Sequence, residues 1–270
     1  MKSITLIVAG LMLLACAFAV PQAGTVVVVD AWAYDQHSES GTGTYYLEQN
    51  RARVDFKGKD SDMTVIYRLD GEEPVMWVID NQVSQYTELD KDKINKAYGQ
   101  MQQQLEMMDT YMAKLSAEER ESIKQQYKKQ IRQAHKLMTF EDRAKKMSYE
   151  KVESGVDVNG WACDYYKGIF DKALYEEVWV ANWKTVGLEP SDFSVLDGMA
   201  GFFKGFAGDL MPLADKKVEG GGTINGLPIK LVLFEDGNKF MKKEVKEIRK
   251  EDFDPSLFEL PEGLEEAEAE

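Results

Sequence analysis

Few residues of this chain could perform acid–base, nucleophilic or metal chemistry. The sequence holds two histidines, His37 and His135, which lie roughly 100 residues apart with no cysteine or carboxylate at metal-ligand spacing beside them. Cys163 lies in an alternating strand pattern and has no basic neighbour in sequence that would lower its thiol pKa, so we interpret it as a small buried apolar residue. We therefore predict no catalytic residues, no metal site, no cofactor and no enzymatic activity.

Two further segments resemble ligand-binding motifs only in part. Asp90-Lys91-Asp92 begins like a calcium loop, but Ile94 occupies the fifth position, and the glycine and terminal glutamate of such a loop do not follow. The glycine run 220–222 follows no apolar strand and opens no helix, which makes a phosphate-binding loop improbable.

The composition indicates a globular protein that does not bind nucleic acid. The chain has 270 residues, of which 44% are hydrophobic, enough for a sizeable core. Its 47 acidic residues against 33 basic residues give a formal net charge of −14, which repels nucleic-acid phosphates and anionic lipid surfaces.

The first 23 residues have the pattern of an export signal. Lys2 precedes an apolar run over residues 4–14, which is too short to span a bilayer, and small residues follow. Cleavage after Ala19 would release a secreted chain, whereas Leu13-Leu14-Ala15-Cys16 resembles a lipobox in which Cys16 would be lipidated. Both alternatives place the protein outside the cytoplasm, in the periplasm or at the outer membrane of a bacterium, with a membrane contact only through the lipid anchor.

Most of the remaining chain reads as short strands. Eleven segments rich in Val, Tyr, Thr and Trp are bounded by turn residues, and Asn159-Gly160 is the strongest hairpin signal. We expect one antiparallel meander, an α+β fold whose curved half-barrel has about 11 strands: Thr25–Gln36, Gly43–Gln49, Arg51–Lys57, Met63–Leu69, Val75–Asp80, Val83–Leu89, Met147–Glu153, Trp161–Phe170, Leu174–Asn182, Leu227–Glu235 and Lys239–Arg249.

Two helical segments interrupt these strands. Residues 90–146 predict a helical hairpin with one apolar seam on its first helix, a capping box at Ser116–Glu119 and a second helix over residues 117–140. The seam consists of Ile94, Tyr98, Met101, Leu105, Met108, Met112 and Leu115. Residues 189–213 carry one stripe of large apolar side chains and one of glycines, which predicts either a helix packed close to the sheet or a loosely held lid.

These elements divide the chain into three parts. Residues 1–23 are the signal segment, and residues 24–258 form a single domain that includes the helical insert 90–146 and the lid segment 189–213. Residues 259–270 form an acidic C-terminal tail, disordered from about Glu262 onward.

Large apolar side chains occur on both faces of two predicted strands, around Trp77 and Trp179. Such strands need cover on both sides, or a cover and a cavity. The helical segments could pack as ordinary core, or the glycine-rich segment could close a pocket that binds an apolar ligand. In the second alternative the ligand-binding residues are Trp77, Trp179, Met199, Phe202, Phe203 and Phe206.

Several motifs along the chain resemble one protein family. They are residues 50–56, 76–80, 86–88, 160–163, 177–181 and 258–263, together with the Met/Gln-rich helical insert. The set resembles an uncharacterised bacterial envelope family related to the LolA/LolB-like lipoprotein carrier superfamily. The resemblance implies a half-barrel of 11 antiparallel strands closed by helices around an apolar cavity. In the carriers that cavity holds the acyl chains of lipoproteins, and other relatives bind envelope partners or act as sensors.

We therefore expect an exported, non-enzymatic protein that binds an apolar small molecule or acyl chain, of a lipid or lipoprotein, beneath a helical lid. The alternative is an envelope protein–protein interaction or sensor module that uses the helical hairpin to bind a partner protein or a second copy.

Overall fold

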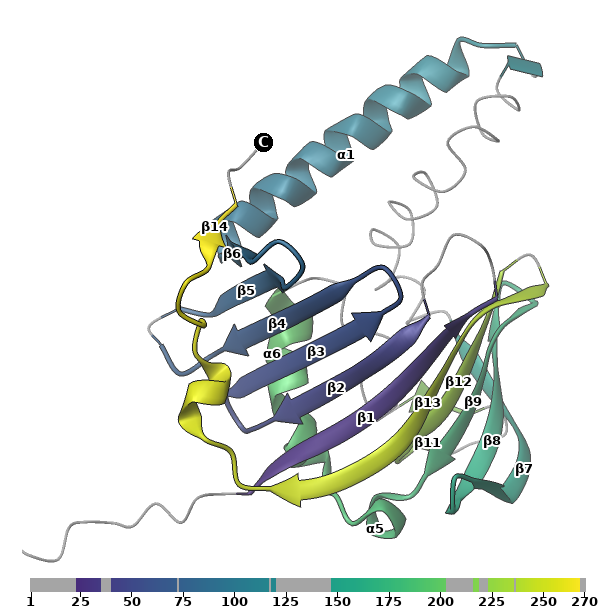
Figure 1. Cartoon of the computed structure of the whole chain (residues 1–270). Coiled ribbons are helices and arrows are strands. Elements are labelled where there is room, and N and C mark those ends of the chain that lie inside the picture. Colours follow the sequence, from purple (N-terminus) through teal and green to yellow (C-terminus); the bar gives the residue numbers. More distant parts are fainter. Residues whose placement is uncertain are drawn as a thin grey trace, which may run out of the picture.

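The computed structural model describes residues 23–34, 40–71, 73–116, 118–119, 147–202, 216–218, 223–235 and 237–267 (Figure 1). The predicted signal segment with Cys16, nearly all of the second helix of the insert, and both histidines lie outside these residues.

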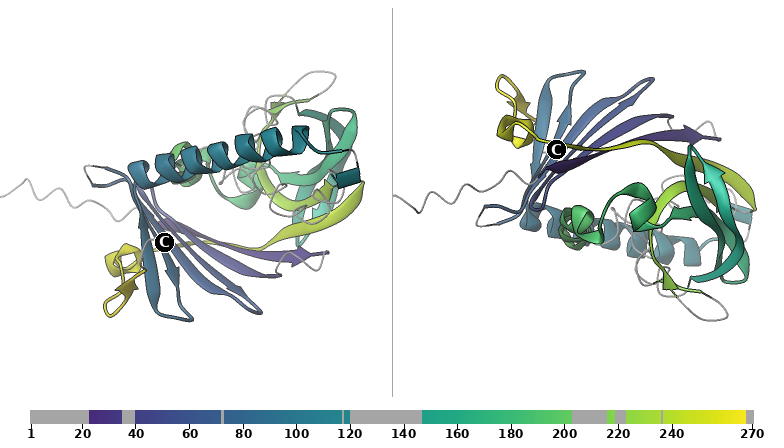
Figure 2. Two further views of the ribbon diagram at one scale, coloured as in Figure 1. Left: turned by 90° about the horizontal axis from the view of Figure 1, so that it is seen from above. Right: turned by 90° about the horizontal axis from the view of Figure 1, so that it is seen from below.

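An open, curved sheet dominates the described part of the chain (Figures 1 and 2). Twelve strands follow one another in the order β14-β6-β5-β4-β3-β2-β1-β13-β12-β9-β8-β7, and all neighbours are antiparallel except β14 and β6. The strands are β1 (Gly24–Ala33), β2 (Gly41–Leu47), β3 (Arg51–Gly58), β4 (Asp62–Arg68), β5 (Val75–Asp80), β6 (Gln85–Leu89), β7 (Ser148–Val158), β8 (Trp161–Phe170), β9 (Ala173–Ala181), β12 (Leu227–Glu235), β13 (Asn238–Glu251) and β14 (Glu265–Glu266).

The predicted antiparallel, sheet-dominated class is confirmed, and each of the eleven predicted strands has a counterpart in the sheet. The expected single meander is wrong in one respect. The strands form two meanders, β1–β6 and β7–β9 with β12 and β13, which join where β1 pairs with β13. Turn residues reveal hairpins between neighbours in sequence, but they carry no information about which distant strands meet.

Three two-residue strands were not predicted: β10 (Lys216–Lys217), β11 (Thr223–Ile224) and β14. β10 and β11 form a separate small sheet, and β14 adds to the β6 edge through bonds from Glu265 N to Ser84 O and from Ala267 N to Tyr86 O. Two residues are too few to show an alternating pattern. The end of the chain, predicted to be disordered from Glu262, is thus held against the sheet as far as Ala267.

The hairpin at Asn159-Gly160 has the expected geometry. Asn159 has a φ of 53° and Gly160 a φ of 86°, so both occupy the left-handed region that a type I′ turn requires. This tight turn sets the register in which Val158 pairs with Trp161.

The first helix of the insert, α1 (Lys91–Ala113), starts where the β6 edge ends and extends away from the strands (Figure 1). Asp90, part of the rejected calcium motif, is its N-cap and accepts a bond of 2.7 Å from Lys93 N. Beyond the helix, Ser116 and Glu119 form the predicted capping box: Ser116 N donates to Glu119 Oε2 and Glu119 N donates to Ser116 Oγ.

The seam predicted on α1 is only half-buried at the members whose side chains the structure describes, Ile94, Met108, Met112 and Leu115. The side chains of Tyr98, Met101 and Leu105 lie outside the described residues.

Three short helices follow β9: α5 (Trp183–Val186), η1 (Pro190–Phe193) and α6 (Ser194–Phe202). The largest core cluster forms where these helices meet the sheet, and it includes Trp183, Phe193, Val195 and Leu196. At Gly198 in α6, an added Cβ would lie 2.7 Å from Leu69 Cδ1, so the absence of a side chain lets this helix approach the sheet closely. The second helical segment therefore packs on the sheet as far as Met199.

The last short helix, η2 (Pro255–Phe258), belongs to a C-terminal strap, residues 252–267, that crosses strands on the other face of the sheet. Phe258 is fully buried there, and Arg51 places its guanidinium 4.9 Å from the ring centre. Arg53 Nη1 donates to Leu257 O over 3.1 Å, and Arg68 forms an ion pair with Glu259.

Candidate functional site

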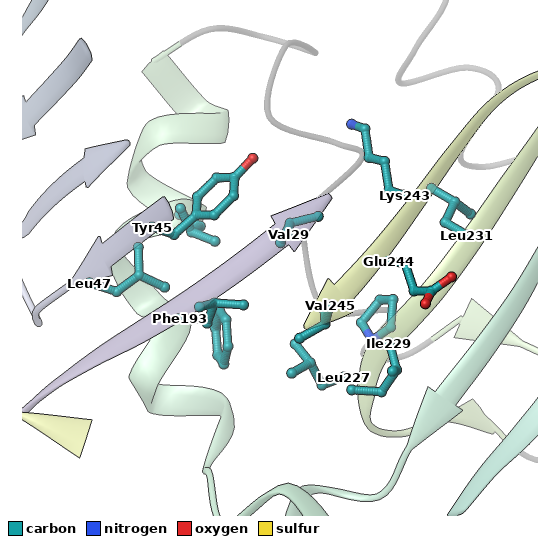
Figure 3. A pocket seen from close by; sticks show the side chains of 13 residues that line it. Val29, Tyr45, Leu47, Phe193, Leu227, Ile229, Leu231, Lys243, Glu244 and Val245 are labelled. Atoms are coloured by element: carbon teal, nitrogen blue, oxygen red, sulfur yellow. The ribbon is translucent and has the colours of Figure 1, made fainter. Parts of the chain in front are cut away.

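An apolar pocket lies between the two halves of the sheet and the start of α6 (Figure 3). Three parts of the chain that are distant in sequence build it. Strands β1 and β2 supply Val27, Val29, Tyr45 and Leu47; η1 and α6 supply Phe193 and Leu196; and β12 and β13 supply Leu227, Pro228, Ile229, Leu231, Lys243, Glu244 and Val245.

Strand register explains why these side chains converge. Val27 pairs with Tyr45, and Thr25 pairs with Leu47, so alternate residues of β1 and β2 share one face. Val29 pairs with Val245 across the junction of the two meanders, which continues this face onto β13. The pocket therefore exists only because the first and the last long strands of the domain are neighbours.

The pocket is narrow and open to solvent. Its interior cavity measures about 40 Å³, within about 490 Å³ of space that includes the opening. Its walls are mostly aliphatic, with Phe193 and Tyr45 as the aromatic members. A space of this shape and chemistry suits a slim apolar group better than a bulky or polar one.

Two charged side chains line the pocket, Lys243 and Glu244. Burial raises the pKa of Glu244, but hydrogen bonds from Lys246, Lys242 and Asn159 outweigh burial and lower this pKa to about 2. Near neutral pH Glu244 is therefore an ionised carboxylate that accepts three hydrogen bonds, which makes it a poor general acid or base there.

A second, larger cleft of about 690 Å³ lies at one end of the strands, beside Ala23. It is lined by polar groups that are already paired: Arg51 binds Glu48, Lys250 binds Asp192, and Arg68 binds Asp70. Within the described ranges, no group of three or more His, Cys, Asp or Glu side chains is placed to hold a metal ion.

The structure does not bring the predicted ligand-binding residues together in this pocket. Trp77 packs in the cluster beneath the C-terminal strap, with Ile66, Ile79 and Phe258, and donates from Nε1 to Glu88 over 2.9 Å. That cluster lies on the opposite face of strands β3–β5 from Tyr67 and Met76, which belong to the core cluster around the pocket.

Trp179 stacks on Tyr165 with the ring centres 4.6 Å apart, and Lys230 Nζ lies 4.2 Å from its ring centre. Met199 is half-buried on α6 and packs against the core cluster that includes Leu47 and Phe193. The side chain of Phe202, and the whole of Phe203, Phe206 and Cys16, lie outside the described residues. Ligand binding by any of these residues stays a prediction.

These pocket residues were not selected in the sequence analysis, although their spacing along the chain indicates that they share one face of a strand. Val27 and Val29, and likewise Tyr45 and Leu47, recur at every second position, which marks one face of a strand. Cys163 is buried as expected; burial, with the carboxylates of Asp157 and Asp164, raises the pKa of its thiol to about 11.

Comparison with known protein families gives one match. A domain family of unknown function, DUF4412, matches residues 120–264. The chain belongs to this family. The DUF4412 region covers β7–β9, β12, β13 and the C-terminal strap as far as residue 264, so it supplies one of the two meanders and the pocket wall formed by β12 and β13. No curated protein matches the sequence.

Solved structures share coarse features with this DUF4412 protein. An uncharacterized conserved protein from Thermus thermophilus is 8% identical, with a TM-score of 0.43 over 92% of this chain and 91% of that chain. MucB is 8% identical, with a TM-score of 0.40 over 91% of this chain and 60% of that chain. The MucA/MucB complex of Pseudomonas aeruginosa gives 10% identity and a TM-score of 0.41 over 89% of this chain and 56% of that chain.

No helix in the parts of the chain that the structure describes has the length and apolar character needed to cross a membrane.

Proposed function

We propose that this protein is an exported, non-enzymatic binding protein, a half-barrel of the kind found in the lipoprotein carriers, whose pocket takes an apolar chain. The observation that carries the proposal is the composition of the pocket: aliphatic and aromatic side chains from three distant segments line a space that opens to solvent. Binding is favourable when an apolar ligand covers an apolar surface, because the free energy falls by about 25 cal/mol for each Å² of that surface removed from water.

The ionisation of the charged side chains that line the pocket supports binding without catalysis. Glu244 is held ionised by its three hydrogen-bond donors, and Lys243 is the other charged side chain of the lining. A general acid–base pair needs one group that exchanges a proton near neutral pH, and Glu244 does not do so.

Titration of the purified protein with the apolar fluorophore N-phenyl-1-naphthylamine tests the binding. We expect saturable binding that weakens at least about tenfold in Val29→Phe, because the larger ring fills the pocket. Val28→Phe makes the same change on the next residue of β1, whose side chain points to the other face, and should retain binding. Absence of binding, or equal binding by both variants, would contradict the proposal.

Export and lipidation are tested separately. The N-terminal pattern supports export, and its two processing alternatives differ in the fate of Cys16. Metabolic labelling with a radioactive fatty acid should label the protein, and Cys16→Ala should abolish the label, if the lipobox is used. N-terminal sequencing that begins at Val20 would show cleavage after Ala19 instead.

A second candidate function, binding of an envelope protein through the helical insert, is favoured by the surface of α1. Met107 is 64% exposed and Tyr111 is 55% exposed on a helix that extends away from the sheet. Replacing residues 94–138 by a short Gly/Ser linker should leave the sheet folded and abolish co-purification of an envelope partner. A variant that keeps its partner would rule out this function.

A further inference from the structure

The interior of the apolar pocket is too small for a long apolar chain. It measures about 40 Å³, which is room for about three water-sized groups, since about 10–15 Å³ of such space holds one water molecule. A chain of more than a few carbons must therefore remain in the opening or enter space that side chains of the protein fill.

The apolar face of the pocket continues beyond β12 onto β9. Pro228 and Leu231 of β12 line the pocket, and they pair with Val180 and Val178 of β9. Directly paired residues of neighbouring strands present their side chains on the same face of a sheet. Val178 is only 1% exposed and Val180 only 4%, so another part of the chain covers them.

Ile224 contributes to this cover. It lies on β11, outside the main sheet, and is 0% exposed in the cluster that also contains Val178 and Leu231. The chain beside it lies directly against β9, because a Cβ added at Gly226 would lie 2.7 Å from Val180 Cγ1. Ile224 therefore fills apolar space over β9, in a cluster that borders the pocket at Leu231.

From this arrangement we infer that the pocket is the open part of a longer apolar trough, which runs from β1 across β12 to β9, and that Ile224 limits the length of the chain that the pocket binds. The inference rests on the proposed function, since it assigns the chain-length preference of the same pocket. Each methylene group that enters apolar surroundings strengthens binding about fourfold, whereas one that finds the trough blocked adds nothing. The affinity for straight chains should therefore rise with length and stop rising where the chain reaches Ile224.

Straight-chain alcohols that lengthen by one carbon at a time, from hexanol to dodecanol, measure this limit by displacing N-phenyl-1-naphthylamine from the purified protein. Ile224→Ala deletes the side chain beyond Cβ and should extend the limit by about two carbons, with about fourfold tighter binding for each added carbon. Ile224→Val deletes only Cδ1 and should extend the limit by about one carbon. Because Ile224→Val keeps most of the packing, the test does not depend on whether Ile224→Ala folds.

Ile66→Ala is the matched control. Ile66 is also an isoleucine with 0% exposure, but it packs beneath the C-terminal strap, on the other face of the sheet. This variant should lose stability to a similar degree and keep the original limit. Circular dichroism and urea denaturation show that each variant used for binding retains the sheet.

The outcomes separate this inference from the proposed function. If neither the fluorophore nor any alcohol binds, the proposed function fails, and the inference fails with it. The inference alone is overturned if the alcohols bind but their affinity rises without a limit up to dodecanol. It is also overturned if the limit stays unchanged in both Ile224 variants, or if Ile66→Ala moves it equally.

Discussion

At the scale of single residues, Asn159 has two roles that a substitution can separate. Its positive φ forms the β7–β8 turn, while its side-chain Nδ2 donates to Glu244 Oε1 over 3.0 Å and to Val245 O over 2.8 Å. These bonds tie the hairpin tip to β13, although β12 and β9 lie between β13 and β8 in the sheet. The side chain thus helps to hold the curvature beside the pocket.

Asn159→Gly should therefore keep the turn and lose the bonds to β13. We expect a loss of about 1–2 kcal/mol in the free energy of unfolding, measured by urea denaturation, because two hydrogen bonds disappear while glycine still adopts the left-handed conformation. Asn159→Asp should cost more, since a second carboxylate would face Glu244. An unchanged stability in both variants would show that the bonds are not needed.

The environment of Glu244 predicts an acid-dependent loss of stability. Hydrogen bonds from lysines 242 and 246 and from Asn159 lower its pKa in the folded protein to about 2, against an ordinary value of 4.5. A lowered folded-state pKa stabilises the protein above the unfolded-state pKa, and this contribution disappears as the pH falls from about 4.5 to 2.

Glu244→Gln removes this titration and serves as the comparison. We expect the difference in unfolding free energy between the two proteins, about 1–2 kcal/mol at pH 7 after allowance for solvent screening, to shrink toward pH 2. Urea denaturation at a series of pH values measures it. A difference that stays constant with pH would show that Glu244 does not titrate as described.

At the scale of elements, the C-terminal strap replaces a second layer on one face of the sheet. Phe258, Leu257, Leu260 and Leu264 cover Ile66 and Ile79, which would otherwise face water. β14 also occupies the main-chain groups of Ser84 and Tyr86 on the β6 edge, and a covered edge is less able to pair with another chain.

Phe258→Ala should therefore destabilise the whole sheet and not only the strap. We expect a loss of about 3–4 kcal/mol, because a fully buried ring is replaced by a cavity. Phe258→Leu should cost much less, and the midpoints of urea denaturation compare the two. If Phe258→Ala costs under about 1 kcal/mol, the strap is not part of the cooperative fold.

At the scale of the whole molecule, the β1–β13 pair holds the two meanders together. Gly24 pairs with Glu251, so the centre of the sheet forms from the two ends of the domain. By contrast, β7 lies at an edge of the sheet, with register shifts near Glu153 and exposed residues along most of its length. Its exposed charges and irregular register discourage pairing with other chains.

Hydrogen exchange should reflect this arrangement. We expect the amides of Val26–Val29 to exchange only through global unfolding, at least about 100-fold more slowly than the edge amides of Glu150–Glu153. Mass spectrometry of peptic fragments measures both in one experiment. Equal protection at the centre and at the edge would mean that the two meanders do not depend on the β1–β13 pair as described.

The sequence alone determined the local structure of this protein. Alternating apolar residues and turn signals such as Asn159-Gly160 predicted the eleven strands, and the spacing of Ile94 to Leu115 predicted the first helix of the insert. These signals depend on residues that are neighbours in the chain, so the sequence displays them directly.

Only the tertiary structure decided which residues form the pocket. Trp77 and Val29 both lie on strands with apolar side chains, yet the strap covers Trp77 while the β1–β13 pairing places Val29 beside Val245 and Leu227. Which face is covered, and by what, depends on contacts between segments far apart in sequence, and local propensity carries no record of those contacts.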